Sequence, residues 1–302
     1  MSGIAVLVVA LLVGFSIVIS NSSRSGRDGA RSGSAHTSAP SAAATSGTSH
    51  TPVPRTALPR PSEIPASPKP TPAYGSYVAL GDSYAAGVGS GDEKGRCRRS
   101  PHAYPQVLNA NPEIFLQRDV ACTGATTADV QRYQLSALTD QTDLVTLTVG
   151  GNDLDVATLS DACAKGVTQS CETKFRESLT LLNVLPDRLA ATFSAVAQAA
   201  PKARIIVTGY PLMFKMPSTD SPQFPTIAIA NAATASLDQL IKNAVKKKRS
   251  DGVRIQYVAV DFAGHEIGDK TPWVNATGRD AFHPTADGSA AIAKAIATAL
   301  KK

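Results

Sequence analysis

The stretch YVALGDSYAAGVGSG, residues 77–91, decides the fold class. Its first four residues, 77–80, form a short apolar run without polar alternation, which is typical of a strand covered on both faces. The run leads directly into Gly81-Asp82-Ser83-Tyr84, so Ser83 lies at a strand-to-helix turn where its hydroxyl can be exposed and its backbone N–H left free. A buried strand that feeds a helix in this way indicates a parallel sheet flanked by helices.

Similar apolar runs recur along the chain, separated by patterns with helical spacing. The predicted strands are 77–80, 115–121, 144–149, 204–208 and 255–260. The predicted helices include 175–199, with a kink at Pro186, 228–248 and 286–300. This alternation predicts a flavodoxin-like, three-layer α/β/α sandwich with a parallel sheet of about five strands, and it places functional residues beyond the carboxyl ends of the strands.

The first 72 residues differ in composition from the rest of the chain. Residues 4–19 form an uncharged apolar run, so we expect residues 1–20 to be a signal peptide or a membrane anchor. Residues 21–72 are rich in Ser, Ala and Pro and nearly lack large apolar side chains, which predicts a disordered linker. We therefore expect residues 73–302 to form one secreted or extracellular domain, with the N-terminal segment available for contact with a cell wall or a membrane surface.

The net charge of +6 comes mainly from the linker. Residues 21–72 hold six basic and two acidic side chains, which leaves a charge of only +2 on residues 73–302. A nearly neutral domain is a poor binder of nucleic acid, so we expect no nucleic-acid partner and interpret the basic run 246–249 as a solvated helix end. We expect the protein to be a monomer.

The four cysteines all lie in the part of the chain that is expected to fold, and they lack the CxxC spacing of a zinc site. In an exported chain they favour disulfides. The simplest of the three connectivities pairs them in sequence, Cys97 with Cys122 and Cys163 with Cys171, and closes short loops. Spacing leaves the other connectivities open, and four buried thiols are the alternative.

Three loops at the expected edge of the sheet carry groups that suit acyl chemistry. Ser83 suits a nucleophile, Gly124 lets a backbone N–H approach a ligand closely, and Asn152 follows the third strand in a glycine-rich turn. Because fixed N–H donors stabilise the negative charge that develops on a carbonyl oxygen, these three residues are predicted to form an oxyanion hole. The alternatives are that Ser83 is a helix cap and that Asn152 is a turn residue. A third alternative is a dinucleotide-binding loop, but the sequence GVGSGD does not match the GxGxxG spacing of such loops.

A serine nucleophile also needs a base, and His283 is the first candidate. It precedes the last predicted helix, and Asp280, three residues upstream, can turn back to bind the second imidazole nitrogen. The remaining histidines are His36, His50, His102 and His265. The first two lie in the linker, and the loop of His102 has no acidic neighbour. His265, which could pair with Asp261 or Glu266, is the reserve candidate.

Four sequence blocks resemble, in order and spacing, those of the SGNH (GDSL-type) hydrolases, particularly secreted actinobacterial lipase/esterases: Gly81-Asp82-Ser83-Tyr84, the glycine of CTGATT at 122–127, Gly150-Gly151-Asn152-Asp153 and Asp280-x-x-His283. The resemblance covers essentially all of residues 75–302, and four short blocks in the right order are specific. It implies Ser83 as nucleophile, His283 as general base and Asp280 as its orienting carboxylate. The oxyanion donors would be the N–H groups of Ser83 and Gly124 and the side chain of Asn152.

Other family features bear on single residues. Asp82 and Asp153 match motif positions, and we expect them to support loop geometry. In some members a backbone carbonyl takes the place of the carboxylate, so both partners stay open for the imidazole. Secreted relatives often have a third disulfide, whereas this chain has Gly268 at the corresponding position and no cysteine over 213–226. We therefore expect the segment after Tyr210-Pro211 to be freer than in those relatives.

The resemblance implies a serine esterase or lipase that hydrolyses carboxylic esters through an acyl-enzyme and needs no metal or cofactor. Its substrate would be a small-molecule or lipid ester, and the apolar segment 211–225 would either line an acyl pocket or cover the edge of the sheet. Two alternatives remain. One is a carbohydrate (acetyl) esterase acting on cell-wall or plant polysaccharide, and the other is a non-catalytic wall-binding domain.

Overall fold

The computed structural model describes residues 72–155, 158, 162 and 168–301. The expected leader, almost all of the expected linker and Cys163 lie outside the described residues. Within them, no helix has both the length and the apolar character needed to cross a membrane.

Five parallel strands form one sheet in the order β2-β1-β3-β4-β5. Their bounds are β1 (Tyr74–Gly81), β2 (Ile114–Asp119), β3 (Leu144–Thr148), β4 (Arg204–Thr208) and β5 (Ile255–Val258). The predicted five-stranded parallel sheet is therefore confirmed, and its order is that of flavodoxin-like folds. The first strand begins earlier than predicted because Tyr74 pairs with Ile114 at the start of β2.

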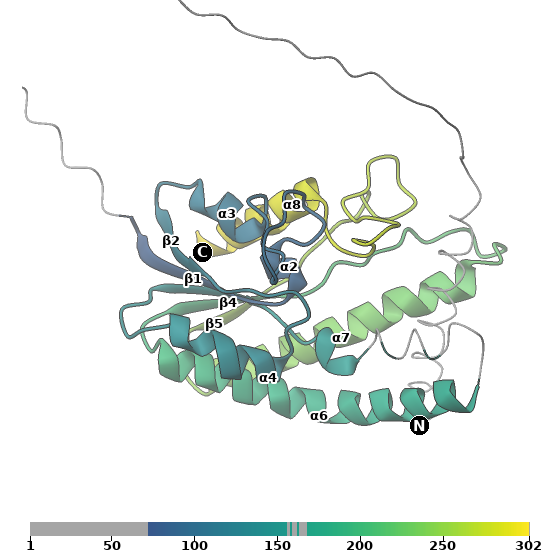
Figure 1. Cartoon of the computed structure of the whole chain (residues 1–302), viewed down its shortest axis with the longest axis horizontal. Helices are drawn as coiled ribbons and strands as arrows, with labels where there is room; N and C mark the ends of the chain where they lie inside the picture. The colour runs from purple at the N-terminus through teal and green to yellow at the C-terminus, as the bar shows by residue number, and fades with distance from the viewer. Residues whose placement is uncertain (1–71, 156–157, 159–161, 163–167, 302) are drawn as a thin grey trace, which may run out of the picture. The chain divides into compact units, whose positions relative to one another are not determined.

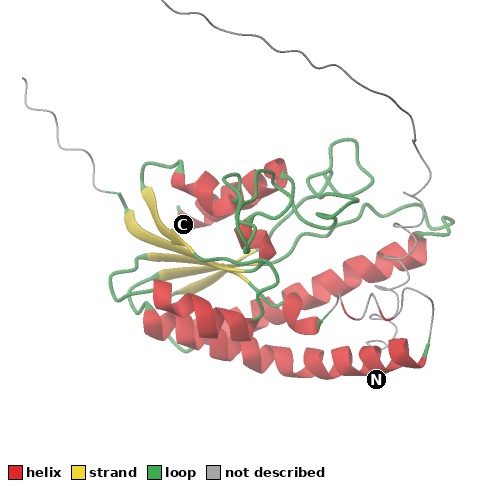
Figure 2. Cartoon of the chain, viewed as in Figure 1, coloured by secondary structure: helices red, strands yellow, loops and turns green. Residues whose placement is uncertain are grey.

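Helices cover both faces of the sheet, so the predicted three-layer sandwich is confirmed (Figure 1). One face carries α2 (Ser83–Ala86), α3 (Tyr104–Asn109) and α8 (Ala286–Leu300). The other carries α4 (Thr127–Asp129), α6 (Gln169–Ala199) and α7 (Phe224–Ser250). Both layers stand out in Figure 2, where the strands lie between them. All five residues of β3 are buried, so this central strand is covered on both faces of the sheet.

The helix bounds follow local capping signals. Helix α6 begins six residues before the predicted start because the Thr168 side chain accepts a hydrogen bond from the Cys171 N–H, and the helix continues on both sides of Pro186. Helix α7 begins at Phe224, with Pro225 in the first turn, where a missing N–H costs no hydrogen bond. Helix α8 has the predicted bounds and is capped by Thr285.

The Cys97–Cys122 disulfide is present. It ties the loop after β2 to a segment that follows α2. Cys171 is also disulfide-bonded, and its predicted partner, Cys163, lies outside the described residues.

Candidate active site

The Ser83 hydroxyl meets the His283 imidazole at the carboxyl edge of the sheet. Ser83 is the first residue of α2, directly after β1, and His283 lies just before α8. Their side chains, 200 residues apart in sequence, are joined by a hydrogen bond of 2.9 Å between Ser83 Oγ and His283 Nε2. The structure therefore brings together the predicted nucleophile and the predicted base.

The second nitrogen of His283 contacts a main-chain carbonyl instead of the predicted carboxylate. His283 Nδ1 lies 3.1 Å from the Ala281 carbonyl oxygen. The Asp280 carboxylate instead forms an ion pair with the Arg98 guanidinium. Because a carbonyl oxygen only accepts, Nδ1 donates to it, which leaves the lone pair of Nε2 to accept the Ser83 proton. Of the two partners that the sequence left open, the geometry favours the backbone carbonyl.

The surroundings of His283 favour its neutral form. Burial lowers the pKa of its imidazole below the ordinary value, and the positive charge of Arg98 acts in the same direction. The hydrogen bond to Ala281 and the negative charge of Asp280 oppose this shift. A base with a lowered pKa is unprotonated at neutral pH and so is ready to accept a proton.

The predicted oxyanion donors come from the loops after β1, β2 and β3. The Ser83 N–H is at the first position of α2, and Gly124 has a φ of +77°. Among the described residues, neither of these two N–H groups has a hydrogen-bond acceptor. Asn152 Nδ2 donates one hydrogen to the Ala125 carbonyl at 3.1 Å, which fixes the amide and leaves its second hydrogen for a ligand. Because the strand order reverses between β1 and β3, these loops open onto the crevice where such sheets bind ligands.

Tyr210, which the sequence did not single out, joins the Ser83 loop to the Asn152 loop. Its hydroxyl donates to Asp82 Oδ2 at 2.5 Å and accepts from the Gly151 N–H at 3.0 Å. The other oxygen of Asp82 accepts from the Tyr84 N–H at 2.9 Å. Burial raises the pKa of Asp82 to about 7, against the lowering effect of these hydrogen bonds. Asp82 thus supports the geometry of the Ser83 turn, as expected. The signal for Tyr210 was its place just beyond the carboxyl end of β4.

The Tyr210→Phe variant should lose stability because it leaves the Gly151 N–H and one oxygen of Asp82 unpaired. We expect the free energy of unfolding to fall by about 1–3 kcal/mol, the cost of unsatisfied buried polar groups. Urea unfolding measures the change. Tyr133→Phe is the matched control, because Tyr133 is 62% exposed, and it should unfold like wild type. Equal stability of the two variants would contradict the bridging contacts of Tyr210.

Two more buried side chains hold these loops together. The Asp153 carboxylate accepts hydrogen bonds from both the N–H and the hydroxyl of Thr127, so it fixes the segment after Gly124 against the Asn152 turn. Gln134 accepts from the Gly81 N–H at 2.7 Å and donates to the Gly81 carbonyl at 2.9 Å. Gly81 itself has a φ of +126°, and a Cβ there would lie 2.3 Å from the Thr148 carbonyl, so only glycine fits before the nucleophile turn.

The other histidines of the folded part lie in separate contacts. His102 does have an acidic neighbour, because its Nε2 lies 3.0 Å from Asp92 Oδ2; the expectation that it has none was wrong. The pair is exposed, and a separation of ten residues gives no signal in the sequence. His265 binds neither predicted carboxylate. Its Nδ1 contacts the Thr271 carbonyl at 2.8 Å, and its ring stacks on Trp273 at 3.7 Å.

The segment after Tyr210-Pro211 is tied to the stretch around Gly268 without a disulfide. Ile267 donates to the Met213 carbonyl at 2.8 Å and accepts from the Lys215 N–H at 3.0 Å. Lys215 also forms an ion pair with Asp269 at 2.6 Å. A Cβ added at Gly268 would lie 3.3 Å from that of Lys215. Main-chain hydrogen bonds and an ion pair thus hold this segment, and that it is freer than in the secreted relatives stays a prediction.

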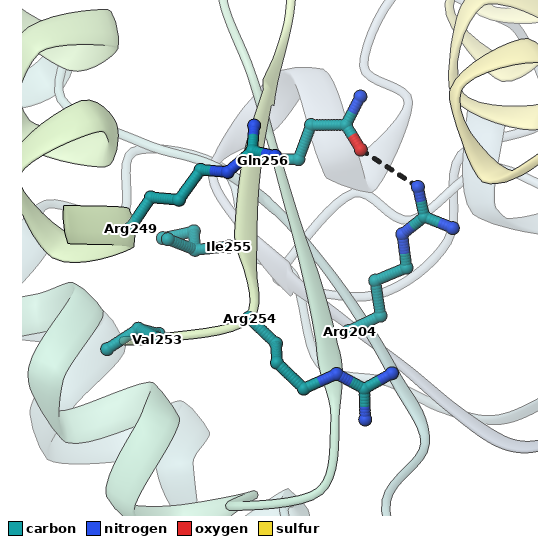
Figure 3. A pocket seen from close by; sticks show the side chains of 6 residues that line it. All are labelled: Arg204, Arg249, Val253, Arg254, Ile255 and Gln256. Atoms are coloured by element: carbon teal, nitrogen blue, oxygen red, sulfur yellow. Dashed lines mark hydrogen bonds between the residues drawn. The ribbon is translucent and has the colours of Figure 1, made fainter. Parts of the chain in front are cut away.

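A pocket of about 380 Å³ at the opposite edge of the sheet contains none of the predicted site residues. It lies where β4 and β5 begin and is lined by Arg204, Arg249, Val253, Arg254, Ile255 and Gln256 (Figure 3). Arg204 donates to Gln256 at 2.9 Å and to the carbonyls of Ala299 and Leu300 at 2.8 and 3.0 Å. Its guanidinium therefore caps the end of α8, which is a structural role.

A serine hydroxyl bonded to a neutral imidazole, beside fixed N–H donors and on a flavodoxin-like sheet, is the arrangement of an acyl-transferring serine hydrolase. Comparisons with known proteins agree with this class. Residues 79–291 match the GDSL-like lipase/acylhydrolase family, and the chain belongs to this family. It is a carboxylic ester hydrolase.

Its relatives include lipases from two Streptomyces species. The lipase of Streptomyces rimosus is 32% identical over 219 residues, which cover 70% of this chain and 81% of the relative. Lipase 1 of Streptomyces coelicolor is 33% identical over 223 residues, with the same two coverages.

Two solved structures are also similar to this chain. The crystal structure of the extracellular lipase from Streptomyces rimosus has a TM-score of 0.64 at 31% identity and covers 74% of this chain and 99% of its own. The phospholipase A1 from Streptomyces albidoflavus has a TM-score of 0.63 at 34% identity, with the same two coverages.

Proposed function

We propose that Ser83 is the nucleophile and His283 the general base of this ester hydrolase. The observation that carries the proposal is the hydrogen bond of 2.9 Å between Ser83 Oγ and His283 Nε2. His283 Nε2 takes the hydroxyl proton while Oγ attacks the carbonyl carbon of the ester. The Ala281 carbonyl holds Nδ1–H and so stabilises the imidazolium that forms.

The negative charge that develops on the ester carbonyl oxygen is stabilised by the N–H groups of Ser83 and Gly124 and the amide of Asn152. Collapse of this tetrahedral intermediate breaks the bond to the alcohol, which leaves with the proton from His283, and the acyl group stays on Ser83 Oγ. Water then attacks the acyl-enzyme, His283 accepts the proton of that water, and the carboxylic acid is released. The Asp280 carboxylate, which binds Arg98, takes no direct part in this scheme.

The proposed substrates are lipid esters. Apolar side chains gather beside His283, because Phe282 precedes it and packs against Phe214 with ring centroids 5.8 Å apart. Leu212 and Met216, on the same segment as Phe214, are 44% and 45% exposed. An apolar pair beside the base, on a segment that also exposes apolar side chains, suits an acyl chain better than a sugar. The lipase and phospholipase relatives support the same substrate class, and they give the carbohydrate-esterase and wall-binding alternatives less support.

The extracellular lipase relative and the disulfides support secretion of this chain. In this proposal residues 1–20 direct export, and residues 21–72 link them to the catalytic domain that begins at residue 73. Contact of the N-terminal segment with a wall or membrane surface, and a monomeric state, belong to the same proposal.

An acyl-chain profile of the purified protein tests the substrate class. We expect kcat/KM to rise from p-nitrophenyl acetate to longer acyl esters and to be low on acetylated polysaccharide. The Phe214→Ala variant should lose about tenfold in kcat/KM on the longer esters, because one apolar contact is worth about 1–3 kcal/mol, and should lose little on the acetate. Phe115→Ala, at an exposed position on β2, is the control and should keep the wild-type profile. A preference for acetate or for acetylated polysaccharide would contradict the lipid-ester proposal.

A further inference from the structure

Arg98 lies between two segments that flank the Ser83–His283 pair. Its guanidinium forms an ion pair with the Asp280 carboxylate and lies 3.6 Å from Glu93 Oε1. Glu93 accepts a hydrogen bond from the Gly89 N–H at 2.7 Å, just after the nucleophile helix. The Arg98 and Glu93 side chains are each 17% exposed and that of Asp280 is 35% exposed, so the group is partly shielded from water. Arg98 therefore connects the region after Ser83 to the turn that carries His283.

That turn needs external contacts to keep its shape. Phe282, between Ala281 and His283, has a φ of +66°, which residues with a side chain rarely adopt. The Phe282 carbonyl accepts from the Tyr84 hydroxyl at 2.7 Å, and its N–H donates to the Asn275 carbonyl at 2.7 Å. These bonds hold the end of the turn next to His283. The Arg98–Asp280 ion pair holds the other end, next to the carbonyl of Ala281.

The segment that presents Arg98 is itself fixed. Cys97 is bonded to Cys122, and the Cys97 carbonyl accepts from the Thr123 N–H at 3.1 Å. The neighbouring Arg99 donates to the Ala121 carbonyl at 3.1 Å. The segment that carries Arg98 is therefore cross-linked to the loop that contains Gly124. This cross-link fixes the position from which Arg98 binds Asp280.

We propose that Arg98 is a positioning residue for His283, because its ion pair with Asp280 holds the 280–283 turn so that the Ala281 carbonyl keeps the imidazole directed at Ser83. Asp280 then acts through Arg98 and the main chain, and not as a direct partner of the imidazole. This inference rests on the proposed roles of Ser83 and His283 and goes beyond them.

Steady-state kinetics of the full chain on p-nitrophenyl butyrate test the inference. Arg98→Gln and Asp280→Asn should each lower kcat about tenfold with little change in KM, since small misplacements of reacting groups cost one to two orders of magnitude. The double variant should be no worse than either single variant, because both break the same contact. Arg98→Lys, which keeps the charge, should recover part of kcat. Arg96→Gln is the control, since exposed Arg96 forms no ion pair among the described residues, and should match wild type.

The pH profile gives a readout that a merely structural role would not move. Arg98 and Asp280 are the two charged side chains that shift the imidazole pKa, while Tyr84 packs beside it as a neutral ring with centroids 5.7 Å apart. Without Arg98 the imidazolium is less disfavoured, so the pKa of His283 rises and the acid limb of kcat/KM moves to higher pH. Without the carboxylate of Asp280 the pKa falls, and the limb moves to lower pH.

Wild-type kcat in Arg98→Gln would overturn the inference even if the acid limb shifts, because the charge of Arg98 alone moves the imidazole pKa. So would a lower Tm with kcat and the acid limb unchanged, because that result shows a purely structural ion pair. A Ser83→Ala variant run in parallel separates the two proposals. If Ser83→Ala is inactive, the proposed function stands and the Arg98 variants test only the positioning role. If Ser83→Ala is active, the proposed function is overturned, and this inference falls with it.

Discussion

Replacing Ser83 with alanine should lower kcat for a soluble p-nitrophenyl ester by about 10⁴-fold or more, because the covalent route through the acyl-enzyme is lost and only binding and oxyanion stabilisation remain. The effect on stability should be small, since the change removes one oxygen from a side chain that is already buried. Initial rates at saturating substrate, measured together with thermal unfolding, check both expectations.

Ser136→Ala is a matched control for this experiment, because Ser136 is an exposed serine in the short helical turn Leu135–Ala137 and has no proposed role in the reaction. It should hydrolyse the ester at the wild-type rate. A Ser83→Ala variant that keeps more than about a tenth of wild-type kcat would mean that another group attacks the ester, since loss of the nucleophile costs several orders of magnitude.

Replacing Asn152 with alanine should lower kcat by about 10²–10³-fold with little change in KM, because a donor aimed at the oxyanion acts mainly in the transition state. The variant also loses the hydrogen bond from Asn152 Nδ2 to the Ala125 carbonyl, which costs about 0.5–1.5 kcal/mol of stability. Separate kcat and KM values from full saturation curves are the measurement.

Asn243→Ala is the control for the amide, because Asn243 is exposed on α7 and its side chain is hydrogen-bonded only to Gln239 among the described residues. Its kinetic constants should equal those of wild type. Unchanged turnover in Asn152→Ala would remove Asn152 from the oxyanion hole. A higher KM at constant kcat would assign its amide to ground-state binding instead.

The sequence predicted the framework of the site because three of the four blocks each follow a strand of a parallel sheet. The apolar runs before Gly81 and Gly150 indicated strands covered on both faces, and parallel strands bring their carboxyl ends to one edge. That rule was enough to place Ser83, Gly124 and Asn152 on neighbouring loops. The helix start after His283 was equally clear, since Thr285 caps α8 where the pattern predicted.

The partner of the imidazole could not be predicted, because a main-chain carbonyl leaves no mark in the sequence. Asp280 stood at a suitable distance along the chain, but Arg98, 182 residues away, binds its carboxylate. The backbone at Arg98 has a φ of +53°, and no local pattern indicates such a conformation at an arginine. A long-range ion pair between two loops depends on the finished fold.

The supporting side chains were missed for a similar reason. Gln134 lies in a short helical turn, Val130–Gln134, and its amide binds the backbone of Gly81. The two residues are far apart in the sequence, so no local pattern indicates the contact. Tyr210 lies just beyond β4 and could have been suspected from its position. The link between Lys215 and Asp269 pairs opposite charges on two loops, so only the structure shows that these loops meet.

Labelling with a fluorophosphonate probe, followed by mass spectrometry of the digested protein, tests the pairing of Ser83 with His283 most directly. We predict a single adduct on the peptide that contains Ser83. The adduct should be absent from Ser83→Ala and should form slowly in His283→Ala, because the hydroxyl then lacks its base. An adduct on a different serine, or ester hydrolysis by the wild-type protein without any adduct, would contradict the assignment of Ser83 as the nucleophile.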